Sequence, residues 1–126
     1  MFIVHSERRL TLDTLELARY IVEAIADKKG ENVLLLDIRD ISILADYFVI
    51  GSATSTRQTR AIVGWIKQEV KQSFNVSPMH IEGEPESGWV LMDYGDIVVH
   101  LFTPEMRDYY DLEGLWRDGR VIVRMF

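Results

Sequence analysis

The sequence of 126 residues contains no cysteine and has only three prolines and eight glycines. Without cysteine the chain can form no disulfide, thiolate metal site or cysteine nucleophile. Sparse proline and glycine leave no linker, so one domain over residues 1–126 is expected. No apolar run approaches the ~20 residues of a membrane-spanning helix, and the opening Met1–Val4 is too short for a signal peptide core. The sequence therefore predicts a single globular domain in the cytoplasm.

Basic residues are also scarce, because 14 Lys and Arg stand against 20 Asp and Glu, a formal net charge of −6. This balance disfavours generic coating of nucleic acid, which needs a basic surface. The acidity is concentrated in residues 82–113, which hold nine acidic residues and one base, Arg107. Aromatic residues are interleaved with these acids, a combination that suits an interface with a basic partner. The alternative is that the aromatic and neighbouring apolar residues form core, while the acids only keep the chain soluble. We favour core positions for Phe102, Leu112 and Trp116, and we predict that Trp89 and Tyr94 are exposed.

Apolar periodicity predicts an α/β domain with a mixed β-sheet of about five strands flanked by helices. A helix is expected over residues 12–29, with Thr11 or Asp13 as its N-cap, and a second over residues 55–73, capped by Thr54 or Ser55. Thr103-Pro104 starts a third helix. The expected strands are residues 33–38, 46–52, about 79–81, 89–93 and 97–102, the last two forming a hairpin, and Val121–Val123 is a candidate extra edge strand.

One short motif is typical of enzymes. Gly51-Ser52 lies between a predicted strand and a predicted helix, where nucleotidyltransferase-type folds hold nucleotide phosphates on backbone N–H groups. That chemistry also needs carboxylates to hold Mg²⁺, and residues 53–60 contain none. A turn followed by an N-cap is the simpler interpretation. Asp93 and Asp96 are likewise explained by turn chemistry.

Four basic residues share one face of the second predicted helix: Arg57, Arg60, Lys67 and Lys71. A solvated face opposite the apolar stripe is the default interpretation. The alternative is contact with RNA phosphates.

Three sequence blocks resemble the Iojap or ribosomal silencing factor (RsfS) family. Residues 46–58 read DYFVIGSATSTRQ, and Glu82-Gly83 followed by residues 88–102, GWVLMDYGDIVVHLF, form the second block. Arg107, Tyr110, Leu112-Glu113 and Leu115-Trp116 resemble the closing motif. The resemblance covers about residues 12–116, leaving a short extension, 1–11, and a tail, 117–126, outside it.

The resemblance implies a nucleotidyltransferase-like fold without the catalytic carboxylates, and hence no enzymatic activity, cofactor or metal. It also implies binding to the large ribosomal subunit at the protein uL-fourteen, which blocks joining of the small subunit and lowers translation when nutrients are scarce. Family members also tend to form homodimers. Two alternatives are a nucleotidyltransferase-like nucleotide-binding enzyme and a general RNA-binding module in ribosome assembly. The matching motifs and the local charge assign partner binding to six residues: Trp89, Asp93, Tyr94, His100, Arg107 and Tyr110.

Overall fold

Six strands form one mixed sheet in the computed structural model, which describes residues 2–126 and the side chains of residues 14–126. The elements in chain order are α1 (Phe2–Asp27), β1 (Glu31–Asp37), β2 (Tyr47–Ser52), α2 (Thr56–Phe74), β3 (His80–Glu82), the 3₁₀ helix η1 (Pro85–Ser87), β4 (Trp89–Asp93), β5 (Ile97–Phe102), α3 (Pro104–Tyr110), α4 (Leu112–Leu115) and β6 (Arg120–Met125). No helix in the described part of the chain is long and apolar enough to cross a membrane.

The strand order is β3-β4-β5-β2-β1-β6. Strands β2 and β5 pair in parallel, and the other neighbours pair antiparallel, so the predicted mixed sheet is confirmed. The predicted hairpin is confirmed as well, because β4 and β5 pair from Trp89↔Phe102 to Asp93↔Val98. The sheet gains a sixth strand because β6 pairs with β1, which makes the candidate edge strand in the tail part of the sheet.

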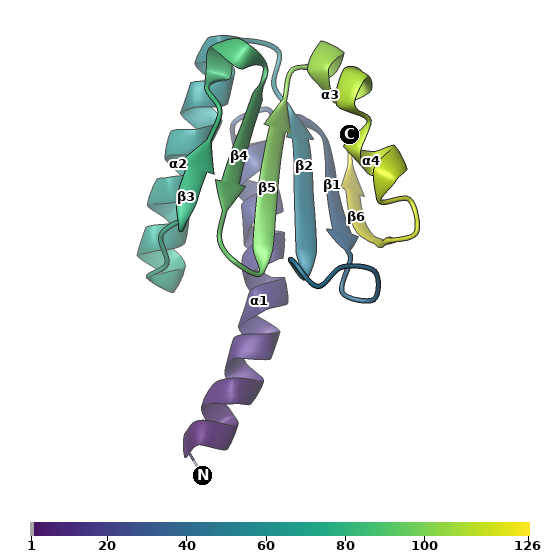
Figure 1. Ribbon diagram of the computed structural model, residues 1–126. Coiled ribbons are helices and arrows are strands. Elements are labelled where there is room, and N and C mark those ends of the chain that lie inside the picture. The colour runs from purple at the N-terminus through teal and green to yellow at the C-terminus, as the bar shows by residue number, and fades with distance from the viewer. Residues whose placement is uncertain (1) are drawn as a thin grey trace.

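The first helix begins ten residues earlier than the sequence pattern predicted. Helix α1 starts at Phe2 instead of near Leu12, so Thr11 and Asp13 lie inside the helix and neither is its N-cap. The predicted start was wrong because Thr11 and Asp13, which often cap helices, were taken as the beginning of the helix. Residues 2–11 contain no glycine or proline, so nothing in them interrupts a helix that starts earlier. The N-terminal turns of α1 therefore project beyond the sheet (Figure 1).

Two other predicted helix starts are confirmed by their caps. The Ser55 side chain accepts a hydrogen bond from the Gln58 backbone N–H at 3.0 Å, which satisfies one free donor of α2. The Thr103 hydroxyl accepts from the Met106 N–H at the start of α3, with Pro104 in the first turn.

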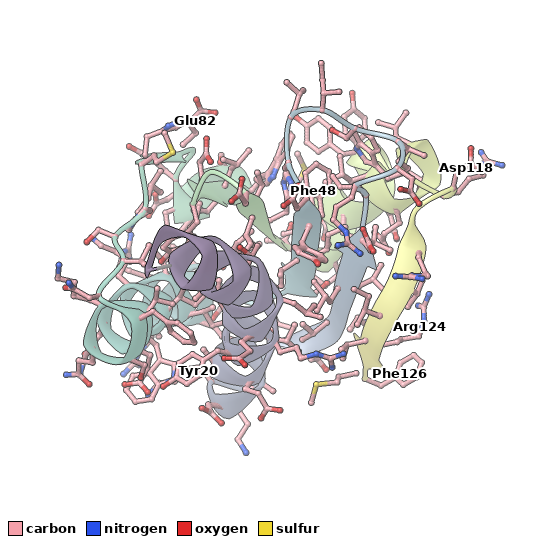
Figure 2. All side chains as sticks on the ribbon, turned by 90° about the horizontal axis from the view of Figure 1, so that it is seen from below. Tyr20, Phe48, Glu82, Asp118, Arg124 and Phe126 are labelled. Atoms are coloured by element: carbon pink, nitrogen blue, oxygen red, sulfur yellow. The ribbon has the colours of Figure 1, made fainter. Side chains whose placement is uncertain are left out.

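Both long helices pack on the same face of the sheet, as the two views show (Figures 1 and 2). Their apolar stripes meet inward-facing residues of the strands in the larger core. Its fully buried members include Ile21, Ile25, Leu35, Val49, Ile62, Ile66, Val99 and Leu101. We call this side of the sheet the helical face.

The opposite side, which we call the front face, carries a smaller core. Leu34, Leu36, Ile50 and Phe102 form its centre, covered by residues of the 38–45 segment and by Met106, Leu112 and Trp116. In Figure 2 the Phe48 side chain projects on this side, away from α1 and α2. The cover lies over β1, β2 and the end of β5, while Trp89 and Leu91 of β4 stay partly exposed. The candidate site lies where this cover ends, at the partly exposed residues of β4.

A substitution of Gly64 tests which side of α2 faces the solvent. It lies exposed in the middle of α2, and a methyl group added there would meet no heavy atom within 4 Å. Because alanine is the better helix former, Gly64→Ala should raise the free energy of unfolding by about 0.5–1 kcal/mol. Urea denaturation should show a higher midpoint with an unchanged m value.

Gly83→Ala is the matched control for this substitution. Gly83 has φ +81°, and an added methyl carbon would lie 2.2 Å from the Trp89 carbonyl oxygen, so this variant should be clearly less stable. A destabilised Gly64→Ala protein would contradict the exposed position of Gly64.

Candidate functional site

Five ring side chains form a cluster on the front face: Phe48, Trp89, His100, Phe102 and Tyr110. Alternation along β4 and β5 places Trp89, His100 and Phe102 there, because Trp89 pairs with Phe102 and Leu91 pairs with His100 across the hairpin. Phe48 comes from β2 and Tyr110 from α3. The Trp89 ring stacks on Phe102 with centroids 5.1 Å apart and meets Tyr110 at 4.5 Å. We call these five residues the aromatic cluster.

His100 anchors the aromatic cluster from inside. Its side chain is buried, and its Nδ1 accepts a hydrogen bond from the Trp89 indole Nε1–H at 3.2 Å. Burial lowers the pKa of His100 to about 4, so the imidazole is neutral at pH 7. Since Nδ1 is the acceptor, the proton of the neutral ring resides on Nε2, which has no hydrogen-bond partner. His100 therefore holds the Trp89 indole from inside the cluster, and its own side chain is buried.

Trp89 and Tyr110 are the members of the cluster that also line a surface cavity. This cavity has a volume of about 220 Å³ and is lined by Glu82, Gly83, Ser87, Trp89, Leu91 and Tyr110. Tyr110 is 41% exposed, and the neighbouring Tyr109, whose ring meets it edge-on at 5.1 Å, is 76% exposed. The cavity thus joins the aromatic cluster to the surface.

Asp93 lies on the same face as Trp89 but at the other end of β4. Four residue-to-residue steps of extended strand separate the two, a distance of roughly 13 Å. Its Oδ1 accepts a hydrogen bond from the Gly95 N–H at 2.7 Å, which confirms the turn role predicted for it. Its Oδ2 lies 3.6 Å from the His80 Nε2, and that nitrogen is 3.4 Å from a Glu82 carboxylate oxygen. Glu82, His80 and Asp93 therefore lie in a row along the outer edge of the front face.

Tyr94 belongs to the helical face, away from the aromatic cluster. Its side chain packs against the larger core and lines a separate cavity with Leu17, Phe74 and Val76. The hydroxyl is buried without a hydrogen-bond partner, and burial raises the pKa of Tyr94 to about 12. Tyr94 is half-buried, so the exposure that its place in the turn suggested is not realised.

Arg107 forms an internal network and is 9% exposed. Its Nη1 donates to the Asn32 carbonyl oxygen at 2.6 Å and to the Ser52 hydroxyl at 2.8 Å. Its Nε and Nη2 bind the two oxygens of the Glu113 carboxylate at 3.0 and 3.1 Å. Arg107 thus ties α3 and α4 to the end of β2, and the Ser52 oxygen of the Gly-Ser motif is engaged by a side chain of the protein itself.

The basic residues of α2 lie apart from this region. Arg57, Arg60, Lys67 and Lys71 are all exposed on the outer side of α2, and Arg60 pairs with Glu86. Their predicted RNA contact stays a prediction.

The site therefore brings together Trp89, His100 and Tyr110, with Asp93 further along the face. Sequence reasoning missed Leu91 as part of the site and gave Glu82 no role of its own. Residues 89–93 were predicted as a hairpin strand, and period-two alternation along that strand places Leu91 on the same face as Trp89, with Val90 and Met92 on the other face.

Comparison with known proteins gives a consistent result. The family model "Ribosomal silencing factor during starvation" (RsfS) matches residues 11–125, which include β6. A protein from Halalkalibacterium halodurans named "Ribosomal silencing factor RsfS" is 40% identical over 107 residues, covering 85% of this chain and 91% of its own length. The mouse protein "Mitochondrial assembly of ribosomal large subunit protein 1" is 34% identical, covering 76% of this chain and 43% of its own length. A crystal structure of a Chromobacterium violaceum protein superimposes with a TM-score of 0.77 at 33% identity, covering 86% of this chain and 92% of that chain.

Removal of the Arg107 guanidinium should destabilise the fold. Arg107→Met keeps much of the aliphatic stem but leaves the Ser52 hydroxyl, the Asn32 carbonyl and the Glu113 carboxylate without their donor. We expect a loss of about 2–4 kcal/mol in the free energy of unfolding, measured by urea denaturation. Arg117→Met, at an exposed residue whose Nε donates to the Gly114 carbonyl, should change the free energy of unfolding by less than about 0.5 kcal/mol. Unchanged stability of Arg107→Met with lost partner binding would instead make Arg107 a contact residue.

The burial of His100 predicts how the free energy of unfolding depends on pH. Its pKa in the folded chain is about 4, below its ordinary value of 6.5, so the unfolded chain binds more protons between these two pH values. The free energy of unfolding should therefore fall as the pH is lowered from 6.5 to 4. Protonation of His100 in the unfolded chain should account for about 3 kcal/mol of that fall. Urea midpoints of His100→Gln, whose side chain does not titrate, should fall less steeply across that window. Parallel pH profiles of the two proteins would contradict the buried neutral imidazole.

Proposed function

Because this chain belongs to the ribosomal silencing factor family, we propose that it binds the large ribosomal subunit and blocks joining of the small subunit. The names of its relatives support the ribosomal partner, and the mouse relative's name refers to the large subunit. Within this proposal the chain acts in the cytoplasm and lowers translation when nutrients are limiting. It forms a homodimer when it is off the ribosome.

One observation supports the location of the contact: the front face over β4 and β5 lacks the helical cover that the other side has. Trp89 and Tyr110 are partly exposed there, and the partly exposed Leu91 follows Trp89 by two residues on the same face of β4. Aromatic side chains that combine an apolar surface with a polar group are the usual anchors of protein interfaces. We therefore place the ribosomal contact on this face.

The charge around the aromatic cluster supports a basic protein as the partner. Nine of the ten charged residues between Glu82 and Glu113 are acidic, and the exception, Arg107, is internal. Ribosomal RNA repels such a surface, whereas a basic ribosomal protein attracts it. We propose uL-fourteen, on the subunit-joining side of the large subunit, as this protein.

The predicted site residues take different roles in this proposal. Trp89 and Tyr110 contact the partner directly, and Asp93 supplies charge at the far end of β4. His100 orients Trp89 through its hydrogen bond. Arg107 holds α3, which carries Tyr110, and Tyr94 supports the hairpin from the helical face.

Inhibition needs no chemical step, because a body bound on the joining surface excludes the small subunit sterically. Its strength depends on how slowly the chain dissociates. The outer face of α2 adds a second contact, with ribosomal RNA, through Arg57, Arg60, Lys67 and Lys71.

Alanine substitution of the two exposed aromatic residues tests the contact. Tyr110→Ala and Trp89→Ala should each weaken co-sedimentation with purified large subunits by about 10- to 100-fold, because central aromatic anchors contribute 1–3 kcal/mol to binding. Circular dichroism would verify that both variants are folded. Tyr94→Phe is the matched control, since the hydroxyl that it removes has no partner and lies on the other face.

The same variants should behave in parallel in a subunit-joining assay followed by light scattering. The unsubstituted chain is expected to prevent subunit joining in proportion to the fraction of large subunits that it occupies. The two Ala variants should need higher concentrations to reach the same inhibition, in line with their weaker binding. Joining that is unaffected by saturating chain would disprove the silencing role, and unchanged binding of both Ala variants would remove the front face from the contact.

A further inference from the structure

We propose that the cavity beside Trp89 receives one arginine side chain of the partner, held between the aromatic wall and the Glu82 carboxylate. This inference rests on the proposed function, because it specifies the partner chemistry of the same face. Three properties of the cavity support it: its size, its charge and the rigidity of its walls.

The cavity has room for one side chain. Its volume of about 220 Å³ is smaller than the roughly 300–1,000 Å³ of pockets that hold drug-sized ligands. Trp89, Leu91 and Tyr110 supply an apolar surface that suits the aliphatic stem of a long side chain. Gly83 contributes no side chain to the wall, and its φ of +81° with the carbonyl of Trp89 close by makes glycine necessary there.

The polar surroundings of the cavity favour a cation. Of the six lining residues one is charged, Glu82, and its side chain is 65% exposed and accessible to a ligand. Glu84 and Glu86 follow it in the connection between β3 and β4, and Arg60 on α2 pairs with Glu86 instead of Glu82. Among the ion pairs of the described residues, the Glu82 carboxylate faces His80 Nε2 at 3.4 Å and no lysine or arginine, so an incoming guanidinium would meet a carboxylate without a permanently charged partner.

The aromatic walls favour a planar guanidinium over an ammonium group. The rings of Trp89 and Tyr110 lie 4.5 Å apart at an interplanar angle of 48°, so they form an angled wall. Arginine stacks on such faces and is less strongly hydrated than lysine. Trp89 is already fixed by stacking on Phe102 and by its bond to His100, so little side-chain freedom is lost on binding.

Nuclear magnetic resonance can test the cavity without a ribosome. The full chain, labelled with ¹⁵N, would be titrated with N-acetyl-arginine amide at constant ionic strength, observing the three tryptophan indole N–H signals. A ligand of this size is expected to bind in the millimolar range. The Trp89 signal should shift and saturate, while those of Trp65 and Trp116 stay in place.

Two further ligands and two variants complete the test. N-acetyl-lysine amide should bind more weakly, and N-acetyl-norleucine amide, which is uncharged, should not shift the Trp89 signal.

Glu82→Gln should reduce the affinity for the arginine amide by about 3- to 10-fold, since the ion pair between the guanidinium and a partly exposed carboxylate is lost. Glu86→Gln, the matched control on the neighbouring loop, should bind as the unsubstituted chain does. Equal shifts with norleucine, or an immobile Trp89 signal, would overturn the proposal, and tighter binding of lysine would overturn its choice of arginine.

Co-sedimentation with large subunits separates failure of this inference from failure of the proposed function. If the chain does not bind large subunits, the proposed function fails, whatever the titration shows. If it binds and Glu82→Gln binds equally well, the contact lies elsewhere on the face and the arginine inference is wrong. Weakened binding of Glu82→Gln, with Glu86→Gln unchanged, supports both.

Discussion

The parallel pairing of β2 with β5 is the constraint on which the rest of the structure depends. These strands align from Tyr47↔Ile97 to Ser52↔Phe102, and parallel neighbours require a long crossover between them. Helix α2 lies in that connection and packs beside α1 on one side of the sheet (Figure 1). Only short elements remain for the other side. They cover its centre and meet the start of β4 through the Tyr110–Trp89 contact, while Leu91 of β4 stays partly exposed and the residues of β3 stay exposed. The partly open front face is thus a consequence of the topology.

Trp89 connects that open face to the interior. Its ring packs on Phe102, which is buried in the smaller core, and its indole N–H is held by His100. An anchor fixed in this way keeps its geometry before a partner arrives, which reduces the entropy lost on binding. The cost is a buried imidazole that must stay neutral, and this links the stability of the site to pH. The proposed interface and the smaller core are therefore stabilised by the same contacts.

Local patterns predicted most of the fold, because caps, turns and strand alternation are encoded by neighbouring residues. Ser55, Thr103 and the β4–β5 hairpin are confirmed for that reason. The early start of α1 was missed, since cap-forming residues can also lie inside a helix. The roles of Arg107 and Tyr94 could not be read from the sequence. Asn32 and Ser52, the partners of Arg107, lie 75 and 55 residues away, and the packing of Tyr94 depends on how α1 and α2 meet the hairpin.

The central claim is that the front face, with the aromatic cluster at its centre, is covered when the chain binds the large ribosomal subunit. Hydroxyl-radical footprinting of the bound chain, read by mass spectrometry, measures that cover directly. Oxidation of Trp89, Tyr109 and Tyr110 should fall sharply on binding, while Tyr20 and Trp65 on the helical side react as they do in the free chain. Protection of the helical side with unchanged oxidation of Trp89 and Tyr110 would contradict the account.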